Sequence, residues 1–121
     1  MKNKQFSFRY RLKSFRFAFN GLKYLIEREH NARIHLVATA LVITFGFAFK
    51  ISLKEWMSLI IVIGLVLVSE IFNTAIETIC DFISPQKHES IKNIKDLSSA
   101  AVLVSAVIAF IIGALIFIQI C

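Results

Sequence analysis

The 121-residue chain is long enough for a single domain, and 57% of its residues are hydrophobic while only 18% are charged. With a mean hydropathy of +0.71, this balance excludes a disordered chain, a coiled coil and a small disulfide-stapled secreted module, and it indicates an integral membrane protein. In a chain this apolar, the net charge of +6 favours lipid headgroups or phosphates as partners rather than nucleic acid.

Residues 6–30 are expected to form an amphipathic helix on the membrane surface. Apolar side chains recur there at spacings of four and three residues, which places them on one helical face. They are Phe8, Leu12, Phe15, Phe19, Leu22 and Ile26. A neighbouring face carries the cations Arg9, Lys13, Arg16 and Lys23. Such a helix lies in the headgroup plane with its cations toward lipid phosphate. A targeting or orientation signal with no further role is the alternative interpretation.

Three apolar runs are expected to cross the membrane as helices, because a backbone in lipid must make its hydrogen bonds internally. We place these spans at 34–52, 56–83 and 97–120, with a polar loop at 84–96 that contains the single proline. Basic residues concentrate before the first span and in that loop. The positive-inside tendency therefore predicts a multi-pass protein of the inner (cytoplasmic) membrane, with its N-terminus and the 84–96 loop in the cytoplasm.

The second span carries a polar stripe, which we call the acidic stripe: Glu70, Asn73, Glu77 and Asp81. At 100° per residue these side chains share one side of a helix. A charged group at the bilayer centre costs about 2.5–3.5 kcal/mol, so the stripe must face protein, water or the cytoplasmic interface. If Trp56 marks the outer boundary, the inner boundary falls near Ile76. Glu77 and Asp81 then lie at the interface and Glu70 about 9 Å deeper. Hydrogen bonding that only holds a bundle together would explain Asn73 alone.

Carboxylates at a membrane surface beside cationic loops suit Mg²⁺, which binds one or two carboxylates together with substrate phosphates. Phosphoryl transfer needs such an ion, cations on the nucleotide and a base near the acceptor hydroxyl. On the same side of the membrane, the next loop offers Lys87, His88, Lys95 and Asp96. The four glycines are scattered and none opens a phosphate-binding loop, so a kinase built from this chain is of neither the P-loop nor the protein-kinase kind.

The run EIFNTAIE at 70–77, followed by Asp81, resembles the signature of the small bacterial membrane lipid kinases, the prokaryotic diacylglycerol kinase and undecaprenol kinase family. The resemblance extends to Lys95-Asp96 with SAAV at 99–102, to Gly21 and to Glu29, and so covers nearly the whole chain from about Phe6. It implies a homotrimer of three-span protomers with a short amphipathic surface helix. It also implies ATP with Mg²⁺ at the cytoplasmic face and a membrane lipid alcohol as the acceptor.

The resemblance further implies roles for individual residues. Glu70 is then the general base on the lipid hydroxyl, Ser99 lies beside the lipid, and Glu29 with Glu77 holds the metal. The residues expected around the nucleotide are Phe17, Glu29, Asn73, Glu77, Asp81, Gln86, Lys87, His88, Lys95 and Asp96. His35 begins a span and is interpreted as an interface anchor rather than as a headgroup or nucleotide contact.

Two departures from the proteobacterial pattern bear on the acceptor. Phe17 and Ala18 stand where the proteobacterial diacylglycerol kinases carry a tyrosine and a serine, and Tyr10 stands where they carry an arginine, which leaves Arg9 or Arg11 to supply that charge. The runs at 31–35, 55–57 and 73–77 are more similar to the undecaprenol kinase branch. Undecaprenol is therefore the expected acceptor. The alternative is diacylglycerol, which would be converted to phosphatidic acid.

Two classes without kinase activity remain open. An ion carrier would use buried acids, but its acids would be expected to continue across the bilayer, and residues 57–69 contain none. A non-catalytic membrane scaffold would explain three spans. It would not explain acids clustered beside basic loops.

Overall fold

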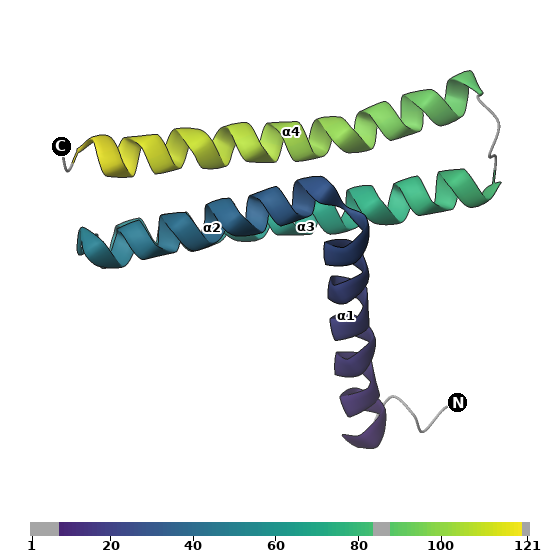
Figure 1. The fold of residues 1–121 in the computed structure, drawn as a ribbon, viewed down its shortest axis with the longest axis horizontal. Coiled ribbons are helices and arrows are strands. Elements are labelled where there is room, and N and C mark those ends of the chain that lie inside the picture. Colours follow the sequence, from purple (N-terminus) through teal and green to yellow (C-terminus); the bar gives the residue numbers. More distant parts are fainter. Residues whose placement is uncertain (1–7, 84–87, 120–121) are drawn as a thin grey trace.

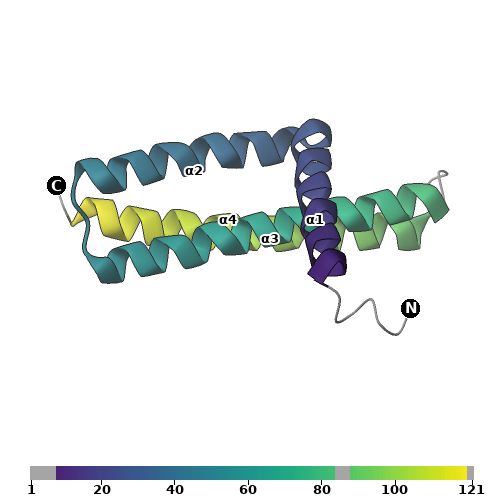
Figure 2. The same cartoon turned by 90° about the horizontal axis from the view of Figure 1, so that it is seen from below.

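The computed structural model describes residues 8–83 and 88–119, which form four helices. They are α1 (Phe8–Arg28), α2 (His30–Ala48), α3 (Leu53–Ile83) and α4 (Glu89–Ile118). The last three are long and apolar enough to cross a membrane, as the sequence predicts. These three run alternately up and down along a common direction, and α1 lies across that direction (Figure 1). Seen from below, α2 lies to one side of the α3 and α4 pair (Figure 2).

The start of α4 corrects the expected boundary of the polar loop, because the chain is helical from Glu89 rather than from residue 97. His88 caps this helix by accepting a hydrogen bond from the Ser90 N–H at 3.1 Å, and Glu89 places an acid in the first turn, where the helix dipole favours it. α3 has 31 residues and is about 46 Å long, whereas a hydrocarbon core is about 30 Å thick. The polar ends of α3 and α4 therefore extend beyond the apolar layer.

The joint between α1 and α2 is a single non-helical residue, Glu29, with φ −103° and ψ 114°. Its N–H donates to the Leu25 carbonyl at 2.8 Å, and its carbonyl accepts from the Arg33 N–H at 3.4 Å. The helix direction changes here although both helix ends stay hydrogen-bonded. The Glu29 side chain does not cap α2, so its carboxylate is available for other contacts. α2 consequently begins at His30, ahead of the expected start at residue 34.

The turn between α2 and α3 is fixed by two local motifs. Lys50 adopts a left-handed conformation with φ 53°, and the Ile51 N–H donates back to the Gly46 carbonyl at 3.2 Å, as in a Schellman C-cap. α3 then begins with a capping box. The Ser52 N–H donates to Glu55 Oε1 at 2.8 Å, and the Glu55 N–H donates to Ser52 Oγ at 3.2 Å.

The interior of the bundle divides into an apolar end and a polar part. Near the α2–α3 turn, Ile51, Leu59, Val62 and Ile116 form a buried apolar cluster. Farther along α3 and α4, several buried side chains are polar: Ser69, Glu70, Asn73, Thr74, Ser98 and Ser105. Burying such groups is costly unless they are partnered. In this part of the bundle, polar side chains therefore occupy buried positions that apolar side chains would fill at lower cost.

Gly46 allows α2 to approach Trp56 of α3 closely. A Cβ on Gly46 would lie 2.7 Å from Cη2 of the Trp56 ring, and that ring also packs on Phe47 with centroids 4.8 Å apart. We expect Gly46→Ala to lower the free energy of unfolding by about 1–3 kcal/mol through overpacking. Thermal unfolding in detergent measures the effect. Gly64→Ala is the control, since its Cβ would meet nothing within 4 Å, and equal Tm values for the two variants would contradict the close approach.

Candidate functional site

The acidic stripe on α3 runs from a buried end to an exposed end. Glu70 is 2% exposed and Asn73 9%, whereas Glu77 is half-buried and Asp81 is exposed. Burial of these side chains thus decreases along α3 from Glu70 to Asp81. The buried carboxylate therefore lies well inside the bundle, and the more accessible ones lie toward the end of α3.

A short hydrogen-bonded chain orients Asn73. Ser98 of α4 donates from Oγ to Asn73 Oδ1 at 2.7 Å, so the opposite edge of the amide is its NH₂ group. That group donates to Glu77 Oε1 at 3.4 Å. Ser98 thus fixes the orientation of the Asn73 amide. The amide in turn holds one oxygen of Glu77. The next residue, Ser99, which is expected to lie beside the lipid, is exposed.

The Ser98 hydroxyl is predicted to matter for stability. Ser98→Ala would leave Asn73 Oδ1 buried without its 2.7 Å donor, and we expect a loss of about 1–3 kcal/mol in the free energy of unfolding. Ser99→Ala, an identical change at an exposed neighbour, should leave Tm unchanged. Thermal unfolding of the two variants in the same detergent makes the comparison, and an equally stable Ser98→Ala protein would show that the hydrogen bond adds nothing.

Two carboxylates from different helices meet beside this chain. The carboxyl groups of Glu29, at the α1–α2 joint, and Glu77 of α3 lie close enough to interact electrostatically. Two ionised carboxylates at such a distance repel each other, and a divalent cation between them removes the repulsion. Across residues 8–83 and 88–119, no group of three or more His, Cys, Asp or Glu side chains is arranged for a metal. The pair still fits Mg²⁺, which takes one or two carboxylates and completes its shell with water and phosphate oxygens.

Cations converge on the exposed end of the stripe. Asp81 contacts Lys95 of α4 at 2.6 Å and Arg28 of α1 at 3.7 Å, so this carboxylate ties together the ends of three helices. Asp96 pairs with Lys92 on its own helix at 2.6 Å. The arrangement also brings the positive charge of Lys95 near enough to Glu77 for the two groups to interact.

Glu70 lies at a small apolar cavity of about 210 Å³ where α1, α2 and α3 meet. Leu22, Leu25 and Ile26 of α1 form one wall. His35 of α2 is the polar neighbour of this carboxylate, with Nδ1 2.9 Å from Oε1. Neither of these two atoms has a well-aligned hydrogen bond within the described part of the chain. A buried carboxylate whose hydrogen-bonding capacity is not used up suits a group that accepts a proton from a ligand.

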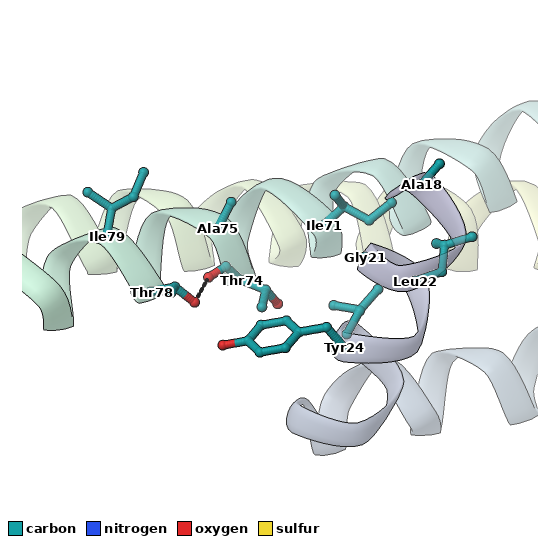
Figure 3. Close-up of a pocket in the computed structure, with 10 residues that line it drawn as sticks. Ala18, Gly21, Leu22, Tyr24, Ile71, Thr74, Ala75, Thr78 and Ile79 are labelled. Carbon is teal, nitrogen blue, oxygen red and sulfur yellow. Dashed lines mark hydrogen bonds between the residues drawn. The ribbon is translucent and has the colours of Figure 1, made fainter. Parts of the chain in front are cut away.

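A larger apolar cavity of about 650 Å³ separates α1 from α3 (Figure 3). Ala18 and Gly21 of α1 face Ile71 and Thr74 of α3 across it. It shares Leu22 and Leu25 with the Glu70 cavity, so the two spaces adjoin along the same side of α1.

The remaining residues expected at the site are less directly placed. Phe17 on α1 is 64% exposed. His88 is used as the N-cap of α4. Gln86 and Lys87 lie outside the described residues. The structure therefore gathers Glu29, the acidic stripe and Lys95 in one region, but it does not gather the whole expected set within one protomer.

A helical bundle with three helices able to cross a membrane, a buried carboxylate, an accessible pair of acids and adjacent cations suits a membrane enzyme that handles phosphate groups. A family model described as prokaryotic diacylglycerol kinase matches residues 16–117, and the chain belongs to that family. It is 40% identical over 105 residues to the undecaprenol kinase of Bacillus subtilis (strain 168), an alignment covering 87% of this chain and 85% of the relative.

Two diacylglycerol kinases are also similar. The protein from Escherichia coli K12 is 31% identical over 111 residues, covering 92% of this chain and 91% of the relative. The one from Synechocystis sp. is 35% identical over 103 residues, covering 84% of this chain and 59% of that longer protein. The sequence-based expectation of a membrane lipid kinase is confirmed. Family membership implies ATP-dependent phosphoryl transfer by a multi-pass membrane protein.

Proposed function

We propose that this chain transfers the γ-phosphate of ATP to the hydroxyl of undecaprenol at the cytoplasmic face of the cell membrane. The observation that carries the proposal is Glu70, a 2% exposed carboxylate at an apolar cavity, close along α3 to the acid pair and the cations. A lipid alcohol needs an apolar wall and a base, and its phosphate donor needs charge nearby. The similarity to a protein named undecaprenol kinase supports the choice of acceptor.

In the proposed reaction, Glu70 accepts the proton of the lipid hydroxyl as its oxygen attacks the γ-phosphorus. The bond between that phosphorus and the bridging oxygen of ADP breaks, and ADP leaves with the electron pair. The apolar wall from α1 excludes water, which would otherwise compete with the lipid as the acceptor. Ser99 is proposed to lie beside the lipid, although within one protomer it is exposed.

Glu29 and Glu77 are proposed to hold Mg²⁺, since their carboxyl groups already lie close enough to interact. When bound, the ion supplies charge stabilisation on the phosphate oxygens. Asn73 contributes indirectly, because its amide holds one oxygen of Glu77 and leaves the rest of the carboxylate for the ion.

The nucleotide is proposed to occupy the exposed end of the acidic stripe. Lys95 pairs with Asp81 at 2.6 Å. In the proposed complex it releases this carboxylate and binds a nucleotide phosphate instead. His88, which caps the start of α4, is also proposed to lie near the nucleotide. The other residues proposed around the nucleotide are Phe17, Gln86, Lys87 and Asp96.

We place α1 in the membrane surface and the N-terminus in the cytoplasm. The apolar face of α1 is exposed in the protomer, with Phe15 65% and Phe19 67% accessible, which suits contact with acyl chains. A homotrimer is proposed as the working assembly. Much of the site is exposed to solvent in a single protomer. Neighbouring copies would contact the exposed Phe17 and Ser99 and so complete the site.

The proposed acceptor is tested by competition between the two lipids. Ala18 lines the larger cavity, whose walls are mostly apolar, with hydroxyl groups from Tyr24, Thr74 and Thr78. These hydroxyls are the donors that this space offers to the ester carbonyls of diacylglycerol, and Ala18 adds none. A site with few such donors favours a polyprenyl chain, although apolar walls alone discriminate weakly. With undecaprenol and diacylglycerol at equal surface fraction in one micelle, we expect undecaprenol to be phosphorylated faster. Faster phosphorylation of diacylglycerol would reverse the assignment of the acceptor.

A further inference from the structure

His35 of α2 lies against the Glu70 carboxylate, and the reaction outlined above gives this histidine no task. Its Nδ1 atom is 2.9 Å from Oε1 of Glu70, and the imidazole is 30% exposed whereas the carboxylate is 2% exposed. The contact joins α2 to α3 at the carboxylate proposed as the base. An interface anchor, the interpretation favoured from the sequence, would not require this pairing.

The surroundings of Glu70 leave His35 as the group that orients it. The cavity at Glu70 is lined mainly by apolar side chains, with Thr39 and His35 as its polar members from α2. Within the described residues, no donor makes a well-aligned hydrogen bond to Oε1. A carboxylate whose neighbours are mostly apolar is free to rotate unless a polar group holds it. With one oxygen facing His35, the other is left for the substrate hydroxyl.

We propose that His35 is a positioning residue for phosphoryl transfer, an inference that rests on the assignment of Glu70 as the base. Its imidazole holds the Glu70 carboxylate in the orientation that accepts the hydroxyl proton, and it acts through Glu70 without touching ATP. Partners that orient a reacting group contribute strongly to rate because small misplacements are costly, about 100-fold for 1 Å.

The space around the imidazole permits a graded test. His35 also lines a second cavity of about 280 Å³ between α2, α3 and α4, so side chains of different length fit at this position. His35→Asn keeps a donor nitrogen bonded to Cγ, where Nδ1 is. His35→Gln moves the donor one bond farther out, and His35→Leu removes it. His30→Leu, at an exposed position in the first turn of the same helix, is the matched control.

We expect His35→Leu to lower kcat by about 10- to 100-fold with the KM for ATP unchanged. His35→Asn should recover most of that loss and His35→Gln less, while His30→Leu retains the wild-type rate. An unchanged kcat in His35→Leu, or equal losses in all three His35 variants, would overturn the positioning role. If His35→Leu does not fold, the difference between the Asn and Gln variants decides, because positioning requires Asn to be the faster.

The same series separates this inference from the proposed function. Wild-type protein that phosphorylates no lipid, or a fully active Glu70→Gln variant, would overturn the assignment of Glu70 and with it the role of His35. An inactive Glu70→Gln variant beside a fully active His35→Leu variant would overturn only the positioning role.

Discussion

Glu70→Gln is expected to abolish phosphorylation of both undecaprenol and diacylglycerol while leaving ATP binding intact. The amide has the shape of the carboxylate but cannot accept the hydroxyl proton. The substitution therefore lowers the rate of the chemical step. General bases contribute about 10²- to 10⁴-fold to rate, and we expect a reduction in kcat of that size. Initial rates with each lipid, together with nucleotide binding by the purified variant, measure the two effects separately.

The matched control for Glu70→Gln is Glu27→Gln, the same substitution at an exposed acid near the end of α1. This variant should phosphorylate lipid at the wild-type rate. A Glu70→Gln protein that turns over either lipid as fast as Glu27→Gln would remove Glu70 from the reaction. The cavity beside it would then have to serve lipid binding alone.

Glu29→Gln and Glu77→Gln are expected to weaken the use of Mg²⁺ and ATP, each raising the metal concentration needed for half-maximal activity by about 10- to 100-fold. The structure also predicts that the same two substitutions raise thermal stability although they lower activity. Because the two carboxyl groups interact electrostatically, replacing either one removes their mutual repulsion. Each variant should therefore unfold at a higher temperature than wild type in the presence of a chelator.

Thermal unfolding with and without Mg²⁺ separates the metal role from a purely structural one. Wild-type protein should gain stability when Mg²⁺ is added together with a non-hydrolysable ATP analogue, and the two variants should gain less, since a ligand stabilises the state that binds it. Unchanged activity in both variants, with the same Mg²⁺ response as wild type, would contradict the metal assignment.

The helices could be predicted from the sequence because each rule involved is local. The long apolar runs and the four-and-three spacing of α1 require only periodicity. The start of α4 was misplaced because residues 89–96 are polar, and a solvated helical end lacks the hydropathy that marks a span. Its N-terminal signal, His88 as cap with Glu89 in the first turn, is weaker than the Ser52 and Glu55 capping box that begins α3.

The site could be predicted only in part. The acidic stripe follows from spacing along one helix, but the contacts that connect it to other helices depend on packing. Ser98 faces Asn73 while the adjacent Ser99 is exposed, because one residue turns a helical side chain by about 100°. The pairing of His35 with Glu70 depends on which residues of α2 and α3 lie side by side. The turn between the two helices sets this alignment, and residue spacing along the sequence does not specify it.

The central claim is that this chain is a lipid kinase whose acceptor is undecaprenol, and transfer of label from ATP to lipid tests it most directly. Purified protein would be incubated with γ-labelled ATP, Mg²⁺ and a total lipid extract of bacterial membranes, and the labelled lipids would then be separated. The account predicts one dominant labelled lipid that co-migrates with undecaprenyl phosphate, and no labelled lipid with Glu70→Gln. Label that stays in ATP and inorganic phosphate with the wild-type protein would contradict it.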